Sequence, residues 1–421
     1  MSSSQAHRTI DAIWRMESAK LIAGLTRMVR DVGLAEDLAQ DALVIALERW
    51  AETGIPDNPG AWLMTTAKRR AIDFIRRSKL RDQKYVEIGH SINLYTEDDV
   101  DQTLDGEIGD DLLRLIFMTC HPVLSQDARV ALTLRLLCGL TTDEIARSFL
   151  VAESTVAQRI VRAKRTLSAE KIPFEVPARE EMKDRMSAVL EVIYLMFNEG
   201  YSATSGDHWI RPLLCQEALR LGRILAEITP HEQEVHGLVA LMEIQASRLK
   251  TRVNAKGEPI LLMDQNRAKW DQLLIHRGLA ALDRSRKLGQ TLGPYSLQAA
   301  ISACHAKARS EAETDWIRIA ALYEALARAT PSLIVELNRA VAISMAFGPA
   351  FGLQIVDELN IEPSLQGYHL LPSVRGDLLA KVGRHDEART EFERAASMTQ
   401  NTRERELLFQ RAANLRVDRS T

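Results

Sequence analysis

Residues 140–167 read LTTDEIARSFLVAESTVAQRIVRAKRTL, and this stretch decides the fold of its surroundings. Thr141 and Glu144 have the spacing of a capping box, which begins a short helix. A short break follows at residues 150–152. In the next segment apolar residues recur at i, i+4, i+7 and i+11 and form one stripe: Val156, Ile160, Ala163 and Leu167. The pattern predicts two short helices joined by a tight turn.

The opposite face of the second helix carries hydroxyl, amide and guanidinium groups, from Ser154, Thr155, Gln158, Arg159, Arg162 and Arg165. Such a face suits the major groove of DNA, where hydroxyls and amides read base edges and arginines bind guanine or phosphate. The alternative is an ordinary amphipathic helical hairpin with a solvated charged face. Spacing alone does not separate these two interpretations.

The residues themselves resemble the promoter-reading helix-turn-helix of sigma factors. The matching positions are Thr142, Glu144, Ile145, Ala146, Leu150, Ser154, Thr155, Val156, Arg159, Arg162, Ala163 and Leu167. The resemblance implies that the six polar residues on the exposed face bind the −35 promoter element. One departure is Ala152, where the family often has a serine N-cap, and alanine caps a helix poorly. LuxR-type activators carry a similar motif, so it does not choose between families by itself.

Two further helices are predicted upstream. Residues 35–50, AEDLAQDALVIALERW, have one packed side and a polar stripe of Asp37, Asp41 and Glu48, and most such stripes are solvated faces. Residues 61–81, AWLMTTAKRRAIDFIRRSKLR, have an inner stripe of Leu63, Ala67, Ala71 and Phe74. Their cations form a basic ridge suited to a nucleic-acid backbone. The turn-rich segment GIPDNPG, residues 54–60, joins the two helices.

This order of segments resembles domain two of extracytoplasmic-function sigma factors. The matching residues are Glu36, Asp37, Leu38, Asp41, Trp50, Pro59, Trp62, Leu63, Arg70, Asp73, Arg76 and Arg77. The resemblance implies that Glu36, Asp37 and Asp41 face the β′ clamp of core RNA polymerase. It also implies that the loop and the basic helix capture the −10 element through Pro56, Asn58, Arg69, Arg70, Arg76 and Arg77, with one base flipped out of the stack.

Both modules occur in the family order, and a LuxR-type regulator would lack the first. We therefore expect region 2 at residues 8–84, an acidic linker at 85–111 and region 4 at 112–170. The resemblance implies an alternative sigma factor that binds core polymerase at the β′ clamp and β flap, recognises promoter DNA and promotes open-complex formation. The alternative is a helix-turn-helix regulator with a sensor domain, which would bind its operator without polymerase.

Residues 178–417 are predicted to form a helical-repeat domain, because helices of ordinary length alternate with short Gly/Pro turns. Gly348 and Leu353 precede Gly383 and Ala388 by 35 residues, close to the ~34-residue tetratricopeptide period. The segment resembles the extension of one subgroup of these sigma factors, and we expect it to modulate activity and to bind a regulatory protein. In it, Asn198-Glu199 could look catalytic, but a helix end closed by Gly200 is the simpler interpretation.

The periodicity is helical throughout, so the fold class is all-α. The four cysteines show no metal-binding spacing, and Cys120-His121 and Cys304-His305 are expected to be packing residues. No phosphate loop, HExxH motif or nucleophile elbow is present, so neither an enzyme nor a cofactor is expected. The first residues lack a signal peptide and no apolar run reaches ~20 residues, which favours a cytoplasmic protein without membrane contact.

Overall fold

The computed structural model describes residues 3–85, 108–149, 151–203 and 205–417. These residues are overwhelmingly helical, as predicted, and the strands among them are only two residues long each. The chain divides into two compact units, residues 1–193 (unit 1) and residues 194–421 (unit 2), and the division falls inside one helix. Most of the expected acidic linker, residues 86–107, lies outside the described residues.

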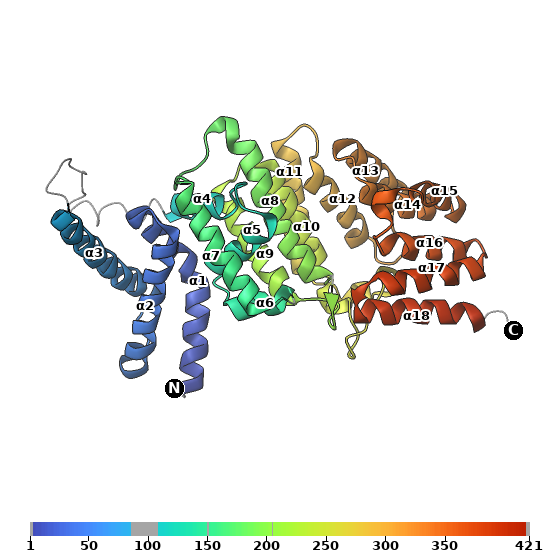
Figure 1. The fold of residues 1–421 in the computed structure, drawn as a ribbon. Coiled ribbons are helices and arrows are strands. Elements are labelled where there is room, and N and C mark those ends of the chain that lie inside the picture. Colours follow the sequence, from blue (N-terminus) through green and yellow to red (C-terminus); the bar gives the residue numbers. More distant parts are fainter. Residues whose placement is uncertain (1–2, 86–107, 150, 204, 418–421) are drawn as a thin grey trace. The chain divides into compact units, whose positions relative to one another are not determined.

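Unit 1 is drawn in blue to green in Figure 1. Its helices are α1 (Ser3–Val29), α2 (Val32–Thr53), α3 (Pro59–Tyr85), α4 (Ile108–Thr119), α5 (Gln126–Leu136), α6 (Thr142–Phe149), α7 (Glu153–Ala169) and the first half of α8 (Arg179–Tyr201). Helices α1, α2 and α3 pack on one another, and α5, α6 and α7 form a second group. Helix α1 packs against α4 and contacts α5, and α2 contacts α7, so the two groups touch within unit 1.

Helix α2 packs closely because its inner side is made of small residues. Ala35, Ala39, Ala42 and Ala46 are all fully buried and recur at i, i+4, i+7 and i+11. Asp31 caps the helix by accepting the Leu34 amide at 2.8 Å. The helix ends where Gly54 adopts a φ of +84°, a conformation that glycine reaches without steric cost.

Helix α3 begins at Pro59, whose fixed φ suits the first helical position. Asn58 caps it by accepting the Ala61 amide at 3.0 Å. Leu63, Ala67 and Ala71 are buried as predicted, whereas Phe74 is 43% exposed, so its place in the inner stripe was wrong. The helical period shows which residues share one face of a helix. It does not show where along the helix the neighbouring helices end and leave that face exposed.

The helix-turn-helix has the predicted local structure. Thr141 and Glu144 form the capping box, with the Glu144 amide donating to the Thr141 hydroxyl at 3.1 Å and the Thr141 amide donating to the Glu144 carboxylate at 2.9 Å. All four stripe residues of α7 are buried. Ala152 stands at the N-cap of α7 and provides no side-chain hydrogen bond.

Unit 2 continues from α8 as a succession of helices, yellow-green to red in Figure 1. They are α9 (Pro212–Ile228), α10 (Gln233–Ala246), α11 (Gln272–Leu288), α12 (Pro294–Lys307), α13 (Trp316–Ala329), α14 (Leu333–Phe347), α15 (Pro349–Leu359), α16 (Leu370–Lys381), α17 (His385–Met398) and α18 (Thr402–Val417). Four short 3-10 helices join some of them: η2 (Leu249–Thr251), η3 (Leu262–Asp264), η4 (Arg267–Lys269) and η5 (Pro363–Leu365). From α12 onward each helix packs on the next along the chain.

The two predicted repeat glycines occupy equivalent turns in this succession. Gly348 joins α14 to α15 with a φ of +115°, and Gly383 precedes α17 with a φ of +83°. Leu353 and Ala388, five residues after each glycine, are both buried. Helical pairs therefore recur at this spacing, while the assignment to the tetratricopeptide class stays a prediction.

The beginning and the end of unit 2 are joined by a short parallel ladder. Strand β1 (Ser205–Gly206) pairs with β2 (Gln400–Asn401). The fully buried Asn401 side chain donates to the carbonyls of Ala203 at 3.0 Å and His208 at 2.9 Å. A buried amide with both hydrogens satisfied makes this junction specific.

Candidate nucleic-acid interface

The outer face of α7 presents the predicted base-reading residues to solvent. Ser154, Gln158, Arg162 and Arg165 are exposed, and Thr155 is half-buried. Because the apolar stripe on the other side is buried, the rotation of α7 about its own axis is fixed. The helix therefore offers one continuous polar surface of the kind that enters a major groove.

Arg159 lies on the same helix but has a partner inside unit 1. Its guanidinium pairs with Asp127 of α5 at 2.9 Å, and both side chains are more than a third exposed. An ion pair this exposed is weak, typically worth ~0–1 kcal/mol. Arg159 is therefore positioned by Asp127 without being prevented from reaching a phosphate or a base.

Three cations of the basic ridge of α3 reach solvent. Arg69, Arg76 and Arg77 are exposed, and Phe74 lies among them with 43% of its surface accessible. Arg70 pairs with Asp41 of α2 at 3.2 Å, and both side chains are largely exposed. This ion pair therefore joins Arg70, which is expected to bind DNA, to Asp41, which is expected to bind polymerase.

The loop before α3 is shaped by the cap of that helix. The side-chain oxygen of Asn58 accepts a hydrogen bond from the Ala61 amide, which leaves its amino group and one oxygen lone pair to meet a ligand. Pro56 is half-buried beside it. The expectation that this loop holds a flipped base therefore rests on its backbone and on one face of Asn58.

The three predicted polymerase-facing acids of α2 have different environments. Asp37 and Asp41 are exposed, but Glu36 is only 3% exposed. The Glu36 carboxylate accepts hydrogen bonds from Arg135 Nε at 2.6 Å and from Gln40 Nε2 at 2.6 Å, and it pairs with Lys164. Glu36 cannot contact a partner protein in this arrangement, because Arg135 and Lys164 of α5 and α7 cover it.

The geometry of two DNA-binding modules agrees with the comparisons to known families. The model of sigma-70 region 2 matches residues 14–81, and that of sigma-70 region 4 matches residues 114–167. The sigma factor SigK of Mycobacterium bovis is 32% identical over 145 residues, which are 34% of this chain and 74% of SigK. The chain belongs to the extracytoplasmic-function sigma factors. It is thus an alternative RNA polymerase sigma factor, from a family of initiation factors whose partners are core polymerase and promoter DNA.

Other relatives cover this sigma factor to different extents. The probable sigma factor SigI of Mycobacterium tuberculosis is 29% identical over 185 residues, 42% of this chain and 61% of SigI. The uncharacterized protein R00370 of Rhizobium meliloti is 41% identical over 384 residues, 91% of this chain and 90% of that protein. Residues 185–286 match a family of unknown function, DUF6596. R00370 therefore shares both the sigma regions and the extension.

Two residues of the Glu36 contact were not singled out from the sequence. Arg135 lies 99 residues from Glu36 and Lys164 lies on the partly buried flank of α7. Each looks like an ordinary helix-surface cation in the sequence. An acid at the fifth position of α2 gives no signal of a partner that distant.

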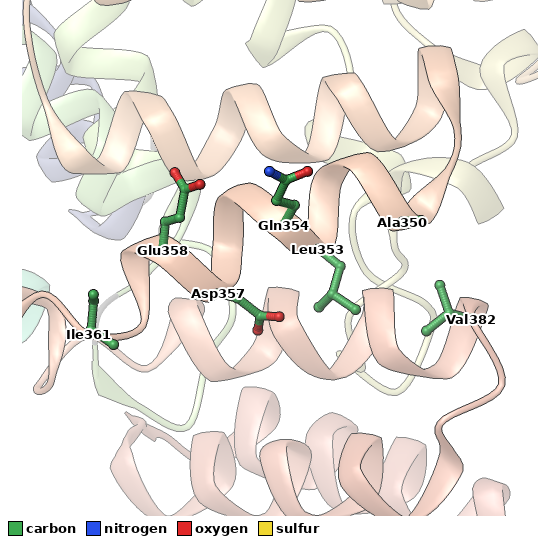
Figure 2. Close-up of a pocket in the computed structure, with 7 residues that line it drawn as sticks. All are labelled: Ala350, Leu353, Gln354, Asp357, Glu358, Ile361 and Val382. Atoms are coloured by element: carbon green, nitrogen blue, oxygen red, sulfur yellow. The ribbon is translucent and has the colours of Figure 1, made fainter.

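Unit 2 of the sigma factor carries a surface groove of about 640 Å³ along α15. Figure 2 shows Gln354 and Glu358 pointing to one side of α15 and Leu353 and Asp357 to the other. The Asp357 carboxylate accepts a hydrogen bond from Arg375 Nε at 2.8 Å. The Ile361 side chain is 79% exposed. The groove therefore combines apolar surface with acidic side chains.

The remaining motifs act in packing. Cys120 is buried with its thiol 3.6 Å from the Thr133 hydroxyl, and burial raises the pKa of that thiol. His305 packs edge-on against Trp316 at 5.2 Å, and burial lowers the pKa of its imidazole to about 3. As expected, both Cys-His pairs include a residue held in a packed interior.

The motif at residues 194–201 requires one correction. Gly200 does not close α8, because the helix continues to Tyr201. A Cβ at Gly200 would lie 2.6 Å from the Cys215 amide nitrogen, so glycine is needed where α8 approaches α9. Glu199 forms a largely buried ion pair with Arg211, which accounts for this acid structurally.

None of the helices in the described ranges has the length and apolar character to cross a membrane.

Proposed function

We propose that this sigma factor reads the −35 element with α7 and captures the −10 element with α3 and the loop before it. The observation that carries the proposal is the exposed polar face of α7 opposite a fully buried stripe. The −35 element would be contacted by the six polar residues of this face: Ser154, Thr155, Gln158, Arg159, Arg162 and Arg165. Hydroxyl, amide and guanidinium groups at this spacing match the donor and acceptor pattern of the major groove.

For the −10 element, the exposed cations of α3 would hold the strand backbone, and Pro56 and Asn58 would contact a flipped base. Phe74 supports this assignment, because an exposed aromatic side chain within a basic ridge is a stacking platform for unpaired bases. Arg69, Arg70, Arg76 and Arg77 supply the charge, and each phosphate contact of this kind makes binding depend on salt.

For polymerase, Asp37 and Asp41 would dock first on the β′ clamp, since both are exposed. Glu36 would join them only after Arg135 and Lys164 have moved away. The region-4 module would contact the β flap. Unit 2 would support initiation and bind a regulatory protein, and the groove along α15 would accept a segment with apolar and basic side chains.

In vitro transcription with purified core polymerase tests the proposal. The full chain should co-elute with core enzyme and direct initiation at defined promoters, while the chain alone should bind the same duplexes weakly. A conventional regulator would bind its operator tightly without polymerase. Tight duplex binding with no association to core enzyme would therefore overturn the proposed function.

A further inference from the structure

One acidic side chain of region 2 is buried by cations of region 4. The Glu36 carboxylate of α2 forms an ion pair with Arg135 Nε of α5 at 2.6 Å and another with the Lys164 ammonium of α7. All three side chains are mostly buried. A buried carboxylate is costly unless it is paired and hydrogen-bonded. Here Arg135 and the Gln40 amide donate to one carboxylate oxygen and the Lys164 ammonium pairs with the other, so the contact is specific.

Other polar contacts flank this one. Asp31, the N-cap residue of α2, also accepts the Ser168 hydroxyl of α7 at 3.2 Å. On α1, Arg27 pairs with the buried Asp111 of α4 at 3.4 Å. Helices α1 and α2 are therefore tied to the region-4 helices at several points within unit 1.

This packing is incompatible with simultaneous reading of two promoter elements. By their numbering, the −35 and −10 elements lie about 25 base pairs apart, which is roughly 85 Å of duplex. Helix α2 has 22 residues, which corresponds to about 33 Å. Two modules packed side by side at α2 and α7 cannot reach both elements, so the contact must open on the promoter.

We propose that Glu36, Arg135 and Lys164 form a latch that closes region 2 on region 4 in the free protein and hides part of the polymerase-binding surface of α2. This inference rests on the proposed function, which places α2 against polymerase and α7 against the −35 element. The latch is suited to reversible closure, because a buried ion pair adds specificity while its Coulombic gain is largely offset by desolvation.

Asp37 and Asp41 remain outside the latch and can make the first contact with polymerase. Opening of the latch then exposes Glu36 and, in the same step, releases α7 to reach the −35 element. Closing the latch lowers the fraction of binding-competent protein, and the apparent dissociation constant rises in inverse proportion to that fraction. Core polymerase and region 4 thus compete for the same carboxylate.

The distance between α2 and α7 in the full chain tests the latch directly. Spin labels at Glu52→Cys and Ala169→Cys mark two exposed positions, and Cys304→Ser removes the one native cysteine that is not buried. Electron–electron double resonance on the free protein should give one narrow distance of roughly 30 Å, because Glu52 lies at the far end of α2 from the Asp31–Ser168 contact. Saturating core polymerase should replace it with a longer one.

Charge-reversal variants test whether the Glu36–Lys164 ion pair holds the latch closed. Lys164→Glu sets a like charge against Glu36 and should make the free protein open, and adding Glu36→Gln to it should restore the narrow distance. Lys183→Glu makes the same charge change on an exposed part of α8 and should leave the distance unchanged. Lys164→Glu should also tighten the apparent affinity for core polymerase about threefold or more relative to Lys183→Glu.

The outcomes separate the latch from the proposed function. A longer or broad distance in the unmodified free protein overturns the latch, and so does a narrow distance that persists unchanged with polymerase bound. An unchanged distance in Lys164→Glu, with melting temperature and helicity retained, overturns the role of this ion pair. Failure to bind core polymerase contradicts the proposed function and leaves the distance measurement in the free protein intact.

Discussion

At the scale of single residues, Arg159 and Arg162 show how neighbouring side chains on one face can differ. Arg162 is exposed on the outer surface of α7, while Arg159 is held by Asp127. An exposed pair restricts a side chain more than it stabilises the fold. Asp127 therefore fixes where the Arg159 guanidinium is presented, and Arg162 keeps its rotamer freedom until it binds.

Replacing Arg162 by Ala should cost ~1–3 kcal/mol of discrimination at one promoter position if the side chain makes a bidentate base contact. Arg159→Ala should do the same or weaken all promoters alike, depending on whether it meets a base or a phosphate. Initiation rates on promoters with single base changes distinguish these cases. Asp127→Asn is the matched control, since it releases Arg159 without removing it.

Transcription at the unmodified level from every promoter in both alanine variants would remove these arginines from the interface. An effect of Asp127→Asn as large as that of Arg159→Ala would show that orientation, rather than contact, is what Arg159 contributes.

At the scale of secondary-structure elements, the described N-caps of α2, α5 and α7 differ in the side chain that each provides. Asp31 caps α2 and Ser125 caps α5 through side-chain acceptors, whereas Ala152 caps α7 with none. An N-cap alanine leaves one helix-end amide without its usual partner. The reading helix therefore starts less firmly than its neighbours.

Ala152→Ser should raise the free energy of unfolding of unit 1 by about 1 kcal/mol, because serine accepts one of the first amides of α7. Thermal and urea denaturation measure the change. Ala157→Ser is the matched control within the same helix, where serine is less favourable than alanine and stability should fall slightly. A loss of stability in Ala152→Ser would mean that α7 does not begin at this residue.

The elements also show what the sequence could predict. The capping box and the buried stripe of α7 follow from local spacing, because each is fixed within about three turns. Phe74 and Gly200 were misplaced, since their environments depend on where another helix begins or ends. The burial of Glu36 depends on cations far along the chain, which no local pattern contains.

At the scale of the whole molecule, the two compact units do not divide where the composition changes. The expected extension starts at residue 178, but the first half of α8 packs in unit 1, where Arg185 donates to the Phe117 carbonyl at 2.9 Å. Arg129 also pairs with Glu191 at 3.4 Å. A chain ending at residue 178 would therefore lose contacts of unit 1 as well as unit 2.

A chain ending at residue 193 is the sharper truncation for testing the extension. We expect it to bind core polymerase and to initiate less efficiently than the full chain, since we propose that unit 2 supports initiation. Promoter-directed transcript yield at equal core occupancy is the measurement. A chain ending at residue 178 serves as the comparison and should also show a lower melting temperature, because the α8 contacts are gone.

Higher transcript yield from residues 1–193 than from the full chain would mean that unit 2 inhibits initiation. Equal yields would place its role outside initiation.

The ladder between β1 and β2 changes how unit 2 should come apart. A stack of helical pairs with free ends frays from those ends, because each pair contacts only its neighbours. Here Asn401 ties the last pairs to the segment that leaves α8, so neither end can peel away alone. Amide hydrogens of α9 and α17 should consequently exchange with solvent in one cooperative opening event. Asn401→Ala should split that event in two, with α17 and α18 exchanging first.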